Sequence, residues 1–131
     1  MERWENLEIW KLADDLALRL YLVTKGFPKD ELYGITSQLR RAALSVPSNI
    51  VEGYSRKGDK ELSRFINISL GSLAETKYLL KFAKKLALLD ENDYEELSRG
   101  YEELGRKLWK FFPASQLPSF LASQLPSFLA S

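Results

Sequence analysis

The side chains of this chain that could perform acid–base chemistry are carboxylates. Glu52 and Glu75 lie beside apolar positions, where a glutamate could transfer protons or bind a metal, as inward-facing glutamates do in di-iron helical bundles. Such sites also need a Glu-x-x-His pair, and the chain has no histidine. It has no cysteine either, which excludes thiol chemistry and disulfides. We therefore expect a noncatalytic protein with no catalytic residue, no metal site and no cofactor.

Several other polar residues share the apolar stripes, where an unpaired charge would be costly to bury. We expect an interhelical network in which Arg40 or Arg41 pairs with Glu52 or Glu75 and fixes the register of the helices. The alternative is a shared polar site for a ligand or a nucleotide. The members of the predicted network are Arg40, Arg41, Asn49, Glu52 and Glu75.

Nucleic-acid binding would require clustered lysine and arginine, and the net charge of the chain is only +1. Acidic residues gather at the predicted helix starts and basic residues at the ends, as the helix dipole favours, so the charges largely cancel in an antiparallel bundle. The best candidate contact is the loop containing Tyr54, Arg56 and Lys57, which sets an aromatic ring beside two cations. The alternative is an ordinary solvated connection.

Four stretches in which apolar residues recur every three or four positions predict four amphipathic helices. We expect them at residues 7–25, 30–53 and 59–88, and from Asp90 or Asn92 to the proline at 113, with Asp30 and Asp59 as N-caps. Short connections favour antiparallel neighbours, so the predicted fold is an all-α, up-down-up-down four-helix bundle.

Prolines and glycines modify these predicted helices. Pro47 should kink the second helix near residues 43–47 without dividing it. Gly71, Gly100 and Gly105 each cost about 1 kcal/mol relative to alanine, which indicates close helix contact. An ordinary helix glycine is an equally good interpretation of Gly100 and Gly105.

The chain changes character after the predicted bundle of residues 1–112. In the tail, residues 113–131, the sequence ASQLPSFL at 114–121 is repeated at 122–129, without charge and with prolines that prevent a continuous helix. One interpretation is a docking peptide that lies on its own bundle or on a neighbouring subunit. The other is an artificial or rearranged extension that packs wherever it can. The apolar residues available for docking are Leu117, Phe120, Leu121, Leu125, Phe128 and Leu129.

The length of 131 residues favours one bundle domain, and no stretch is suited to a membrane. The longest apolar runs, such as residues 82–89, are broken by Lys84 and Lys85 and fall short of the roughly 20 residues that a span needs. The first residues are charged and lack the apolar segment of a secretory signal. We expect a cytoplasmic protein with no membrane contact.

Five stretches of the chain together carry a family resemblance: LEIWKLA at 7–13, FPKDELYG at 27–34, SQLRRAA at 37–43, SVPSNIVEG at 45–53 and LGSLAE at 70–75. Through them the chain resembles, across roughly residues 7–108, the 23S rRNA-intervening sequence proteins. The resemblance implies a four-helix bundle that assembles into a homo-oligomeric ring, usually a pentamer, with structured RNA or a ribonucleoprotein as partner. The alternative is a purely structural homo-oligomeric scaffold, or a protein-interaction module, with no nucleic-acid role.

Overall fold

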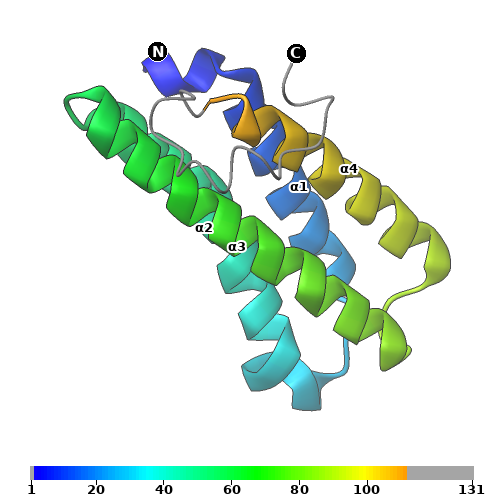
Figure 1. The fold of residues 1–131 in the computed structure, drawn as a ribbon. Helices are drawn as coiled ribbons and strands as arrows, with labels where there is room; N and C mark the ends of the chain where they lie inside the picture. The colour runs from blue at the N-terminus through cyan, green and yellow to red at the C-terminus, as the bar shows by residue number, and fades with distance from the viewer. Residues whose placement is uncertain (1, 112–131) are drawn as a thin grey trace, which may run out of the picture.

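The computed structural model describes residues 2–111, and these form an antiparallel four-helix bundle (Figure 1). Its helices are α1 (Glu8–Thr24), α2 (Ser37–Ser55), α3 (Asp59–Lys85) and α4 (Glu91–Trp109). Three short helical turns complete it: η1 (Arg3–Asn6) before α1, then η2 (Lys29–Glu31) and η3 (Leu32–Thr36) leading into α2. The predicted all-α four-helix fold is confirmed.

The helices pack in the cyclic order α1, α2, α3, α4, and α4 returns to α1, so α1 and α3 are diagonal to each other. Each helix turns one apolar stripe inward. In α1 that stripe contains Ile9, Ala13 and Leu20, and in α4 it contains Leu97 and Leu104, all buried. Burying one such aliphatic side chain fully contributes about 1.5–3 kcal/mol, so the shared core is the main stabilising element.

Small residues let α2 and α3 approach closely. A Cβ at Gly53 would lie 3.1 Å from the Phe65 Cβ and 3.2 Å from the Leu62 Cδ1, which is tighter than an ordinary contact. Further along the same interface the buried Ser69 hydroxyl donates to the Val46 carbonyl at 2.9 Å. The polar atoms of this close interface are therefore satisfied between the two helices.

Both predicted N-caps are wrong, whereas Asp90, one of the two predicted starts of the fourth helix, is an N-cap. Asp90 caps α4, because its carboxylate accepts from the Asp93 backbone N–H at 2.8 Å. Asp59 is instead the first residue of α3, since Gly58 at φ 91° occupies the capping position. Asp30 lies inside η2, which follows Pro28. Both carboxylates still lie in a first helical turn, where the helix dipole favours negative charge.

Helix α3 ends at Lys85, a few residues before the predicted end, because Ala87 adopts a left-handed conformation at φ 61°. The Ala87 N–H donates to the Lys84 carbonyl at 2.9 Å, and the Leu88 N–H donates to the Ala83 carbonyl at 3.0 Å. These two bonds form a Schellman motif, which closes the helix end. Glycine is the residue usually found at this position, and its absence hid the helix end from sequence reasoning.

The backbone irregularity before α2 lies at Gly34, whose φ of −109° and ψ of −117° are not helical. The second helix therefore begins at Ser37, after two short turns, rather than at residue 30. Pro47 lies buried within α2, and the helix continues past it to Ser55. The kink at Pro47 stays a prediction.

The three helix glycines have three different environments. A Cβ at Gly100 would lie 2.3 Å from the Leu16 Cδ2, so the predicted close contact, here between α1 and α4, is confirmed. A Cβ at Gly105 would make an ordinary contact with Leu73 at 3.7 Å. Gly71 is exposed and has nothing within 4 Å, so the predicted close contact is wrong there.

The predicted tail, with its two ASQLPSFL copies and its six docking residues, lies outside the described residues. Within residues 2–111, no helix is long and apolar enough to cross a membrane. In the same range no group of three or more histidine, cysteine, aspartate or glutamate side chains could hold a metal ion.

Candidate functional site

The predicted arginine–glutamate network has different partners in the structure. Arg40 turns toward α1 rather than to a carboxylate: its Nε donates to the Thr24 Oγ1 at 2.9 Å and its Nη2 to the Tyr21 carbonyl at 3.3 Å. Glu52 accepts from Arg56 of its own helix at 2.7 Å. The predicted pairing is therefore corrected, because Arg40 lies on the side of α2 that faces α1.

The remaining members of that network do not meet either. Arg41 and Glu75 are exposed, and neither forms an ion pair within the described range. The Asn49 side-chain amide donates to the Ser45 carbonyl at 2.8 Å and to the Ser45 hydroxyl at 2.9 Å. The Ser45 and Ser72 hydroxyls lie 2.8 Å apart, so neutral hydroxyls take the place of the expected salt bridges between α2 and α3.

The loop predicted to contact nucleic acid joins α2 to α3, and its three residues have different environments. Tyr54 is half-buried with its ring edge-on to Phe111 at 6.5 Å, and burial raises the pKa of its hydroxyl. Arg56 pairs with Glu52, which raises the pKa of the guanidinium, and its Cζ lies 5.6 Å from the Phe65 ring centre. Lys57 is exposed and forms no ion pair with a described residue.

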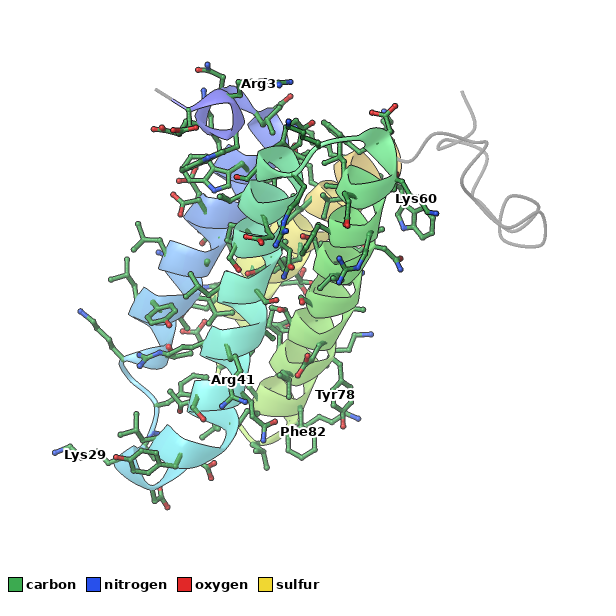
Figure 2. All side chains as sticks on the ribbon, turned by 90° about the vertical axis from the view of Figure 1, so that its left-hand side faces the viewer. Arg3, Lys29, Arg41, Lys60, Tyr78 and Phe82 are labelled. Carbon is green, nitrogen blue, oxygen red and sulfur yellow. The ribbon has the colours of Figure 1, made fainter. Side chains whose placement is uncertain are left out.

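The same end of the bundle carries further exposed cations. Figure 2 shows Arg3 and Lys60 there, on η1 and at the start of α3. Both side chains are exposed and without an ion pair among residues 2–111. Arg64, one turn further along α3, is neutralised by Glu61 at 3.2 Å. Arg3, Lys57 and Lys60 are thus cations at this end that form no ion pair with a described residue.

An apolar groove lies at the opposite end, between the start of α2 and the last turns of α3. It has a volume of about 400 Å³, and its apolar lining includes Ile35, Tyr78, Phe82 and Leu86. Tyr78 is 61% exposed, and its ring lies 6.3 Å from that of Phe82. We call the exposed surface formed by Tyr78, Lys81, Phe82, Lys85 and Leu86 the α3 face.

A second exposed apolar surface lies on α1. Leu18 is 60% exposed and Leu22 is 52% exposed, and they are one turn apart. Asp14 and Asp15 are exposed on the preceding turn and form no ion pair with a described residue. We call the surface formed by Asp14, Asp15, Leu18 and Leu22 the α1 face.

The two faces lie on opposite flanks of the bundle. Figure 2 shows α1 on one side, α3 on the other and α2 between them, with the labelled Tyr78 and Phe82 on the outer side of α3. This arrangement follows from the cyclic packing order, which makes α1 and α3 diagonal. Sequence reasoning missed both faces, although Leu18, Leu22, Tyr78 and Phe82 are out of phase with the buried stripes of their helices.

The comparisons with known proteins identify a family. The profile of the 23S rRNA-intervening sequence protein family matches residues 5–110. No curated protein sequence matches the chain.

A solved structure has a similar fold: the crystal structure of a protein of unknown function from the S23 ribosomal protein family of Bacteroides thetaiotaomicron VPI-5482. It superposes with a TM-score of 0.69 at 19% sequence identity, over 76% of this chain and 94% of the other. The family profile covers most of the chain, and the bundle geometry agrees with this neighbour. The chain therefore belongs to the 23S rRNA-intervening sequence protein family.

Proposed function

We propose that this chain is a noncatalytic, self-assembling bundle that acts as a cytoplasmic scaffold. The observation that carries the proposal is the pair of exposed apolar faces on diagonal helices. Large exposed apolar surfaces on a soluble protein mark interaction sites. Figure 2 shows Tyr78 and Phe82 on the flank of α3, where Tyr78 is 61% exposed and Phe82 is 43% exposed.

The occupant that fits the α3 face is a second copy of the chain. The α1 face presents two aspartates beside Leu18 and Leu22, whereas the α3 face presents Lys81 and Lys85 beside its aromatic residues. Leucines against aromatic rings would form the apolar centre of the contact, and the two aspartates of one copy would face the two lysines of the other at its rim. Complementary charge of this kind fixes the register of an interface and speeds its formation.

Because the two faces differ and lie on opposite flanks, their contact would be heterologous, from the α1 face of one copy to the α3 face of the next. A heterologous contact generates a ring when the rotation closes. The family resemblance implies a pentamer, whose mass would be five times the 15.1 kDa of one chain.

Mass in solution tests this proposal. The full chain at micromolar concentration should give an oligomeric mass by light scattering after size exclusion. The double variants Leu18→Ser with Leu22→Ser, and Tyr78→Ser with Phe82→Ser, should each be monomeric. Leu44→Ser is the matched control, because Leu44 is 49% exposed on α2 and belongs to neither face.

Mixing the two double variants distinguishes a heterologous contact from a symmetric one. Each variant keeps one intact face, so an equimolar mixture should form a dimer of one of each and nothing larger. A monomeric parent chain would refute the self-assembly. An oligomeric parent with a monomeric mixture would refute the pairing of these two faces.

The molecular partner that we propose is structured RNA or a ribonucleoprotein, which the family name suggests. The contact surface is the loop with Tyr54, Arg56 and Lys57, and the cations Arg3 and Lys60 at the same end support it. Repetition of these few cations around a ring would raise the affinity through multivalency. The alternative is a homo-oligomeric scaffold or a protein-interaction module without RNA.

Titration of the full chain with a structured ribosomal RNA fragment, at low and near-physiological salt, tests the RNA contact. Arg56→Ala with Lys57→Ala should weaken binding, and the logarithm of the RNA affinity should fall less steeply with the logarithm of the salt concentration. Arg99→Ala with Arg106→Ala removes the same charge from exposed positions of α4 and should have a smaller effect. Equal weakening by both pairs would refute this surface, and equal affinity for an unrelated RNA would favour the scaffold.

A further inference from the structure

A second cavity lies at the turn that joins α1 to α2, at the end of the molecule where Figure 2 labels Lys29. Its volume is about 240 Å³. Three cations line it, Lys25, Lys29 and Arg40, and no carboxylate is among the lining residues. Asp30 follows Lys29 in η2 but does not line the cavity. The cavity is therefore a local concentration of positive charge in a chain whose net charge is only +1.

Arg40 is held in one orientation by neutral groups. Its Nε donates to the Thr24 Oγ1 at 2.9 Å, and its guanidinium carbon lies 4.8 Å from the centre of the Tyr21 ring. The Thr24 hydroxyl is itself fixed, because it donates to the Tyr21 carbonyl at 3.1 Å. Nη1 has no hydrogen-bond partner in the described range. The fixed guanidinium thus keeps donors available without a carboxylate to neutralise it.

A buried hydroxyl lines the same cavity without a partner. Thr36 is 3% exposed, and its Oγ1 forms no hydrogen bond with any described residue. A buried polar group left unpaired is destabilising and is rare in native proteins. Lys25 and Lys29 are exposed and also lack ion pairs with described residues. Three cations and an unpaired hydroxyl therefore line a space that has no carboxylate in its lining.

We propose that this cavity binds a phosphate monoester dianion. A guanidinium matches two phosphate oxygens with parallel hydrogen bonds, and the Thr36 hydroxyl would donate to a third. The two lysines would supply the remaining charge from the rim. Phe27 and Leu32 form an apolar wall, which leaves room for the group that carries the phosphate. A free nucleotide and the 5′-phosphate of an RNA share this chemistry, and the site does not depend on the self-assembly proposed above.

Calorimetric titration of the full chain with inorganic phosphate and with adenosine monophosphate tests the site. Arg40→Gln should weaken both by about tenfold or more, because it removes a charge-assisted hydrogen bond. Arg99→Gln makes the same change at an exposed position of α4 that does not line the cavity, and it should leave both affinities unchanged. Equal weakening by the two variants, or no saturable phosphate binding by the parent chain, would overturn the proposal.

A second variant, Thr36→Val, separates a loss of phosphate binding from a loss of folding, because valine keeps the shape of threonine and removes only the hydroxyl. Without phosphate this variant should be at least as stable as the parent, while its phosphate affinity falls by a few fold. Unchanged affinity in Thr36→Val would remove that hydroxyl from the site and overturn the geometry argued here. Stronger binding of a 5′-phosphorylated RNA oligonucleotide than of its 5′-hydroxyl counterpart would identify an RNA end as the source, and equal binding of the two would identify a free ligand.

Discussion

Two chemically identical substitutions in helix interiors, Gly100→Ala and Gly71→Ala, should change stability in opposite directions. Alanine is favoured over glycine in a helix interior by about 1 kcal/mol. At Gly71 a new Cβ has nothing within 4 Å, so the full gain should appear. At Gly100 the new Cβ would lie 2.3 Å from the Leu16 Cδ2, far inside the contact distance of two carbon atoms.

The size of the penalty at Gly100 follows from the burial of its neighbour. Leu16 is only 8% exposed, so its side chain cannot rotate into solvent and must displace other core atoms. Overpacking a core in this way costs about 1–3 kcal/mol. Subtracting the propensity gain leaves Gly100→Ala destabilised by roughly 0–2 kcal/mol, and the two variants should differ by about 1–3 kcal/mol.

Urea unfolding followed by circular dichroism, at one fixed protein concentration, measures both free energies of unfolding. In a Leu16→Ala background the clash disappears, and Gly100→Ala should then stabilise the protein by about 1 kcal/mol. Equal stabilisation by the two glycine substitutions in the parent chain would refute the close packing of α1 on α4.

Three further changes test other parts of the structure. Tyr101→Phe should raise the free energy of unfolding by about 1 kcal/mol, because the buried Tyr101 hydroxyl has no partner in the described range. Burial raises the pKa of the Tyr101 hydroxyl in the folded state, so the stability linked to keeping this proton is complete below the unfolded-state pKa of about 10 and is lost as the pH rises further. The melting temperature of Tyr101→Phe should therefore fall less at alkaline pH than that of the parent chain. Ala87→Gly should stabilise the protein by about 1 kcal/mol, since it relieves the left-handed conformation at the end of α3, and a loss of stability in urea would contradict that backbone assignment. Removing residues 114–131 should leave the number of chains in the oligomer and the melting temperature unchanged, because the core cluster is formed by residues of the described bundle. A smaller number of chains or a lower melting temperature would indicate that the tail docks.

The helices were predictable because their periodicity is a local property of the sequence. Stripes such as Ile9, Ala13 and Leu20 in α1 alternate with charged positions at the helical period, and this pattern alone orders the four elements. The end of α3 was not predictable in the same way. Ala87 takes a conformation that alanine rarely adopts, and the packing of the following turn against the core overrides its local preference.

The polar contacts were less predictable, because they depend on which side of a helix faces which neighbour. Arg40 and Arg41 are adjacent in sequence, yet one turns toward Tyr21 of α1 and the other toward solvent. Periodicity places both beside an apolar stripe and does not say which neighbouring helix each one meets. The expected carboxylate partners were therefore wrong for Arg40, and the contact between α2 and α3 is made instead by the hydroxyls of Ser45 and Ser72, which were not among the predicted members of the network.

The two ends of the bundle differ in whether their arginines are paired with carboxylates, and this difference decides which end can bind phosphate specifically. At the α2–α3 loop, carboxylates neutralise Arg56 and Arg64, so only scattered single cations are available to an RNA backbone. At the α1–α2 turn, Arg40 is oriented without a carboxylate partner and lies beside the buried, unpaired hydroxyl of Thr36. A fixed donor set selects an anion by geometry, whereas scattered lysines select only by charge. The α1–α2 turn is therefore the end of the molecule at which a specific phosphate contact should be sought first.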